Sequence, residues 1–89
     1  MTSERELQRL VERWQQLPLD QALSRMPVVR PVVQQLADAV ADVEGRPHVA
    51  VPDLGPRVVM DQLTVTVYDA SQAGLDPAPR LERLRRDLS

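Results

Sequence analysis

Residues 56–74 read PRVVMDQLTVTVYDASQAG, and their conformation decides the fold class of the chain. Aliphatic residues alternate with Thr or Tyr within residues 63–68, which favours a strand, and the β-branched side chains there suit a strand as well. A helix that begins at Pro56 and ends at Gly74 also fits, with apolar residues three and four apart. That apolar stripe consists of Val59, Met60, Leu63, Val67 and Ala70. Only the helix accounts for the DASQAG ending at residues 69–74, so we predict a helix.

The strand interpretation remains the alternative. A strand over residues 57–68 would need a neighbour, and only residues 47–51 could supply one. Those residues lie in RPHVAVPDLG, residues 46–55, which we predict to be an extended linker. The alternative fold is therefore α+β, with a small β-hairpin formed by residues 47–51 and 57–68.

The N-terminal segment predicts an amphipathic helix that Pro18 stops. Ser3 and Glu6 fit the S-x-x-E capping box, in which each side chain binds a free backbone N–H of the other residue. The apolar residues behind this box recur at helical spacing. They are Leu7, Leu10, Val11, Trp14 and Leu17.

Prolines predict the boundaries of the next two helices. We expect a short helix from Asp20 to Met26, because Pro27 forces the preceding residue out of the α region. Pro31 suits the first turn of a third helix, and Gly45 is typical of a helix C-terminus. The stripe of that third helix consists of Val29, Val32, Val33, Leu36, Val40 and Val43.

The last segment begins at Asp76 and predicts a further helix. Its apolar residues, Leu81, Leu84 and Leu88, repeat at intervals of three and four. We therefore predict an all-α fold, a small bundle of four to five short helices. With 89 residues the chain is long enough for one domain, residues 1–89, and too short for two.

The composition indicates a core with few large side chains. There are 13 Val and 12 Leu but no Ile or Phe, and Trp14 and Tyr68 are the only aromatic residues. Burial against a partner would compensate for such a core. All 11 basic residues are Arg, and Lys, Asn, Ile and Phe are absent together, which indicates a GC-rich bacterial genome.

Several classes of protein are excluded or disfavoured. Without Cys there is no disulfide or thiolate metal site. No apolar run approaches the ~20 residues that cross a bilayer, and MTSERELQRL has no apolar signal core. The net charge of −2 gives no general attraction to nucleic acid. We expect a soluble cytoplasmic protein with no membrane contact.

We find no catalytic constellation, and we expect no enzyme activity, no cofactor and no metal. The phosphate-loop motifs and G-x-S-x-G are absent. His48 is the only histidine, and we interpret it as solvated or bonded to backbone. Asp38 and Asp42 lie one helical turn apart, a spacing that a divalent cation could use, but a solvated acidic face explains them better.

The candidate partner surface consists of Val58, Val65 and Tyr68. If residues 56–74 are helical, the two valines lie one heptad apart on the face away from the core. Such a surface suits a partner, although the terminal helix of the same chain could equally cover it. We predict a non-enzymatic helical module for protein–protein interaction or regulation, with self-association as one form of it.

Arginines in the last segment give the alternative function, a nucleic-acid-binding accessory protein. Arg80, Arg83 and Arg86 are the candidate contacts for an anion or nucleic acid. Glu82 and Asp87 interrupt the run, and it contains no aromatic residue, so nucleic-acid binding is not the favoured interpretation. This basic helix could also dock on the acidic side of the helix that contains Asp38, within the chain or across a dimer.

Overall fold

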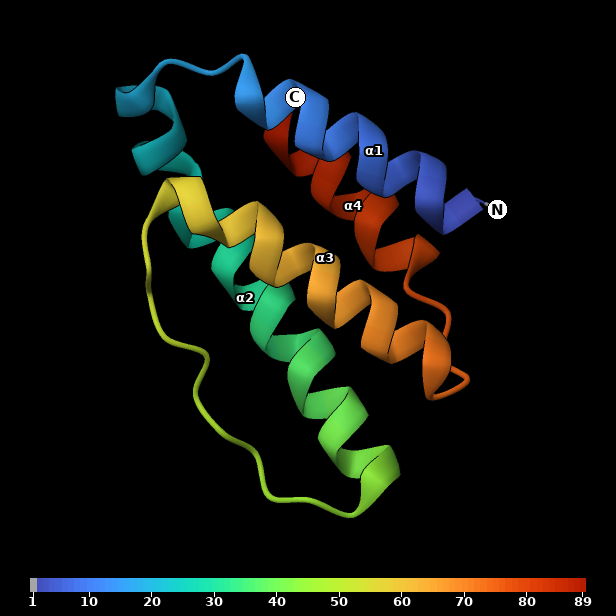
Figure 1. Ribbon diagram of the computed structural model, residues 1–89. Helices are drawn as coiled ribbons and strands as arrows, with labels where there is room; N and C mark the ends of the chain where they lie inside the picture. The colour runs from blue at the N-terminus through green and yellow to red at the C-terminus, as the bar shows by residue number, and fades with distance from the viewer. Residues whose placement is uncertain (1) are drawn as a thin grey trace.

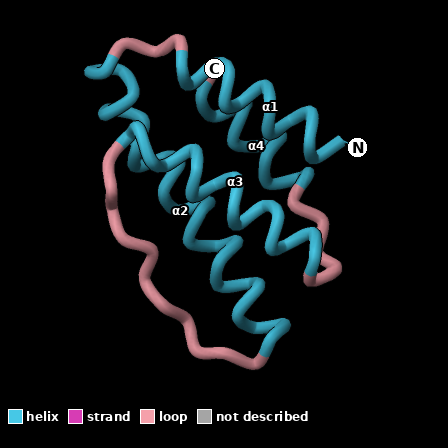
Figure 2. The backbone as a smooth tube through the Cα atoms, viewed as in Figure 1, coloured by secondary structure: helices cyan, strands magenta, loops and turns pink. Residues whose placement is uncertain are grey.

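The computed structural model describes residues 2–89 and contains four helices (Figure 1). They are α1 (Thr2–Gln15), α2 (Leu19–Glu44), α3 (Pro56–Gln72) and α4 (Ala78–Leu88). No strand occurs in this part of the chain (Figure 2), so the all-α prediction is confirmed and the β-hairpin alternative is wrong. Within the described residues, no helix is both long enough and apolar enough to span a lipid bilayer.

Glycines end α2 and α3 where the sequence predicts. Gly45 and Gly74 have φ values of 68° and 83°, a conformation that residues with a Cβ rarely adopt. At the end of α3, the Leu75 N–H donates to the Ala70 carbonyl at 2.9 Å. This bond spans six residues and satisfies one of the free carbonyls of the last turn, as in a Schellman motif.

The predicted break at Pro27 is wrong, because α2 continues through Pro27 and Pro31 as one helix. The two prolines are four residues apart and both lie on the solvent side. Only two backbone bonds of the helix are therefore lost, both on its outer face. Met26 and Val29 are buried beside them, and this packing outweighs the local preference of proline. Figure 1 shows the first turns of α2 bent relative to the rest, as expected near proline.

Almost all packing joins the N-terminal half of the chain to the C-terminal half. The extensive contacts are α2 with α3, α1 with α4, and α2 with α4. As Figure 1 shows, α2 and α3 run in the same direction, so the chain must travel back along α2 between them. Residues 46–55, which we name the strap, make this return. Parallel neighbouring helices require a long crossover connection of this kind.

The core is aliphatic and thin. Its largest fully buried side chains are Leu10, Leu63, Leu81, Leu84, Val29, Val33 and Val59. The exposed area is 5720 Å² for a chain of 10.0 kDa. A folded monomer of that mass exposes roughly 5,200 Å², so this chain exposes about 500 Å² more than expected.

Candidate functional site

The outer face of α3 carries exposed apolar side chains between acids. Val65 is 58% exposed and Tyr68 is 64% exposed, whereas Val58 is half-buried. Asp61 and Asp69 flank them, and neither carboxylate has an ion-pair partner within residues 2–89. We name Asp61, Val65, Tyr68 and Asp69 the α3 outer face. Because α4 packs on α1 and α2, the terminal helix does not cover this face.

A cavity beside Trp14 adjoins the α3 outer face at Asp61. Its volume is about 440 Å³, and it lies between α1, the first turns of α2 and the start of α3. The Trp14 indole N–H donates to the Pro56 carbonyl at 2.8 Å, which fixes one wall. Leu19, 64% exposed, forms part of the rim, and Asp61 belongs both to the rim and to the α3 outer face. The cavity could accept an apolar side chain of a partner.

Sequence reasoning missed Leu19, because the predicted helix began only at Asp20. Leu19 is the first residue of α2 and lies three residues before Ala22, on the same side of the helix. Only the close approach of three helix ends shows that Leu19 borders a cavity.

Two of the candidate arginines border a groove between α2 and α4. The groove has a volume of about 730 Å³. It is lined by Val28, Pro31, Val32, Gln35, Arg80, Arg83, Leu84 and Asp87, and we name it the α2–α4 groove. Arg80 makes a weak hydrogen bond to the Gln35 side-chain oxygen at 3.4 Å. The guanidinium of Arg83 has no polar partner within the described part of the chain.

The other arginines of α4 do not join this groove. Arg85 donates from Nε to Glu6 Oε2 at 2.7 Å and so connects α4 to α1. Glu6 is nearly buried, and its carboxylate serves this contact rather than the predicted capping box, since α1 already begins at Thr2. Arg86 is exposed and lies outside the groove lining. The four arginines of α4 therefore do not form one continuous basic surface.

His48 lies against two aspartates of α2. Its Nε2 is 2.7 Å from Asp42 Oδ1, and its Nδ1 is 3.6 Å from Asp38 Oδ2. The hydrogen bond to Asp42 raises the pKa of His48 above its usual 6.5, against partial desolvation and with help from both negative charges. The two aspartates thus hold an imidazole, a pairing that our interpretation of a solvated or backbone-bonded histidine missed. Within residues 2–89, no group of three or more His, Cys, Asp and Glu side chains is arranged to hold a metal ion.

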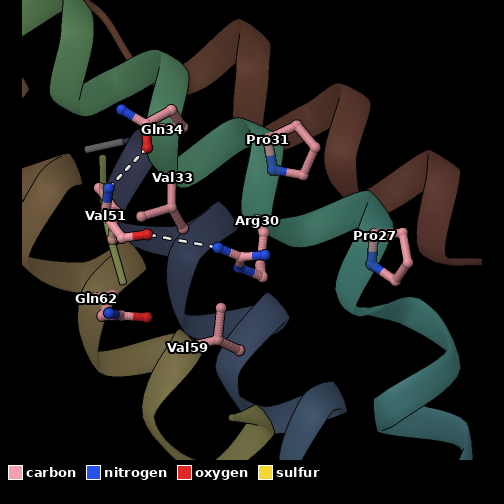
Figure 3. A pocket seen from close by; sticks show the side chains of 8 residues that line it. All are labelled: Pro27, Arg30, Pro31, Val33, Gln34, Val51, Val59 and Gln62. Atoms are coloured by element: carbon pink, nitrogen blue, oxygen red, sulfur yellow. Dashed lines mark hydrogen bonds between the residues drawn. The ribbon is translucent and has the colours of Figure 1, made fainter. Parts of the chain in front are cut away.

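Polar side chains hold the strap along α2, as Figure 3 shows. The Gln34 amide donates to the Val49 carbonyl at 3.0 Å, and its oxygen accepts from the Val51 N–H at 2.8 Å. A side-chain amide thereby makes the pair of bonds that a neighbouring strand would make. Gln62 of α3 donates to the Pro52 carbonyl at 3.0 Å. The strap therefore covers one side of α2, and the sequence gives no signal for these pairings.

Comparisons with protein-family models, with curated proteins and with solved structures find no match to this chain. The candidate surfaces are therefore interpreted from their own chemistry alone.

Proposed function

We propose that this chain is a cytoplasmic, non-enzymatic helical interaction module that self-associates through the α3 outer face. The observation that carries the proposal is the exposure of Val65 and Tyr68 in the middle of a helix whose other side is fully packed. An isolated exposed apolar residue needs no explanation. Here an aromatic and a β-branched residue are exposed three positions apart on the same side of α3, and exposed apolar patches of this kind mark interaction sites.

The exposed area of the chain supports the same proposal. A standard interface covers about 800 Å² of each partner, and the chain exposes about 500 Å² beyond the expectation for its mass. Association through one face would remove this surplus. Tyr68 suits the centre of such an interface, because tyrosine is enriched there and has few rotatable bonds to order.

Nucleic-acid binding has weaker support. Arg85 is neutralised by Glu6, and Arg80 and Arg83 stand over an apolar groove floor, where a phosphate backbone would gain nothing from Val32. The basic side chains also lack the aromatic neighbours on which single-stranded bases stack.

Nuclear magnetic resonance at increasing protein concentration tests the proposed function. We expect the methyl signals of Val65 and the ring signals of Tyr68 to shift between micromolar and millimolar protein. A Val65→Ser variant should lose most of this concentration dependence. Val49→Ser is the matched control, because Val49 is 69% exposed but lies on the strap. Spectra that do not change with concentration, or that change only away from α3, would overturn the proposal.

A further inference from the structure

We propose that the partner of the α3 outer face is the α2–α4 groove of a second copy of the same chain. This inference rests on the proposed function and adds the surface that receives α3. The two surfaces match in chemistry, since one is an apolar ridge between acids and the other is an apolar groove beside arginines.

The groove has an apolar floor and a basic border. Val28, Val32 and Leu84 supply the floor, while Arg80 and Arg83 stand along the α4 side. The charged residues of the lining are Arg80, Arg83 and Asp87, so the net charge of the groove lining is 2 − 1 = +1. A partner that covers the floor must therefore place negative charge against α4.

The α3 outer face supplies that combination. Helix α3 contains Asp61, Asp69 and Arg57, so its net charge is 1 − 2 = −1. Val65 lies four residues from each aspartate, which places it about 6 Å from either along the helix axis. An apolar side chain midway between two carboxylates can enter the groove while the acids stay at its border. This is the geometry of an amphipathic helix bound in a groove.

The paired surfaces share no residue, because no residue of α3 lines the α2–α4 groove. The contact is therefore between unlike surfaces. Two copies that form one such contact leave an unused groove at one end and an unused α3 outer face at the other. Association of this kind continues into an open chain or closes into a ring, whereas pairing between like faces stops at a dimer.

Two charge-changing variants test the pairing. Val65→Arg blocks the α3 outer face and repels the arginines of the groove, while Arg83→Glu blocks the groove. Val43→Arg, at an exposed valine near the end of α2, and Arg86→Glu, outside the groove, are the matched controls. Circular dichroism on all four variants first establishes that the helices are retained.

Sedimentation velocity then measures association at micromolar to millimolar protein. We expect the wild type and both controls to form species larger than a dimer, and each blocking variant alone to sediment as a monomer. An equimolar mixture of Val65→Arg and Arg83→Glu should form a discrete dimer, twice the 10.0 kDa of one chain, because one intact surface of each kind remains.

Other results separate the two proposals. If Val65→Arg abolishes association but Arg83→Glu does not, α3 pairs with something other than the groove. That result overturns this inference and leaves the proposed function standing. If both variants associate as the wild type does, or if the wild type stays monomeric throughout, both proposals are wrong. Separate loss of association in each variant without recovery in the mixture also overturns the inference.

Discussion

Replacing Pro27 or Pro31 by alanine should make the protein more stable. Proline has no backbone N–H, so the carbonyls of Leu23 and Pro27 each lack a helical partner inside α2. Both proline rings lie on the solvent side and are not part of the buried core. Alanine at either position restores one donor to the helix without removing a core contact.

The size of the gain follows from two opposing effects. In a helix interior proline is about 3 kcal/mol less favourable than alanine. Its replacement by alanine also raises the conformational entropy of the unfolded chain, which reduces the gain in stability by roughly 0.4–1 kcal/mol. A net gain of about 2 kcal/mol per substitution remains. For 89 residues the entropy of unfolding is about 190 cal/mol/K. The midpoint of thermal unfolding, Tm, should therefore rise by about 10 °C for each substitution.

Thermal unfolding followed by circular dichroism at dilute protein measures this change. Pro79→Ala is the matched control, because Pro79 lies in the first turn of α4, where the N–H has no helical partner in any case. We expect no gain for it. A lower midpoint for both Pro27→Ala and Pro31→Ala would refute the reasoning. It would mean that the packing of Met26 and Val29 needs the bend that the prolines produce.

Two further expectations concern charged groups. Arg85→Met should cost about 2 kcal/mol in urea unfolding, below the roughly 3–5 kcal/mol of a fully buried pair, because Glu6 keeps the more distant Arg9 at 3.9 Å and Arg85 is 41% exposed. Arg86→Met should cost almost nothing. The hydrogen bond to Asp42 raises the folded-state pKa of His48. The stability that this contact contributes is therefore fully present below pH 6.5 and is lost as the pH rises through the higher folded-state pKa. The urea midpoints of the wild type and His48→Gln should therefore converge at alkaline pH, and a constant difference would contradict the contact with Asp42.

The sequence predicts the helices well because their signals are local. Apolar spacing from Val59 to Ala70 places α3, and Gly45 and Gly74 end α2 and α3 through a backbone conformation that glycine adopts at low cost. Exposure of Val65 and Tyr68 also follows from helical periodicity once the helix is established. Val58, in the first turn of α3, is half-buried instead.

What the sequence does not predict depends on distant residues. Glu6 and Arg85 are separated by 79 positions, and only the packing of α1 on α4 brings them together. The break expected at Pro27 fails for a related reason, since proline acts locally whereas the buried residues beside it gain from contacts across the core. Arg80 and Arg83 stand over a groove because α2 is a neighbour of α4, which the order of the helices along the chain does not reveal.

Topology, more than composition, determines which surfaces remain free for a partner. Because α2 and α3 run in the same direction, the chain must return along α2, and the strap occupies a flank of that helix through Gln34 and His48. An antiparallel pair joined by a short loop would have left that flank open. With it covered, residues 2–89 leave apolar surface elsewhere, on the α3 outer face, in the Trp14 cavity and in the α2–α4 groove. The α3 outer face carries Asp61 and Asp69, and the groove carries Arg80 and Arg83 beside Asp87, so the crossover leaves free the two surfaces that we propose to pair between copies.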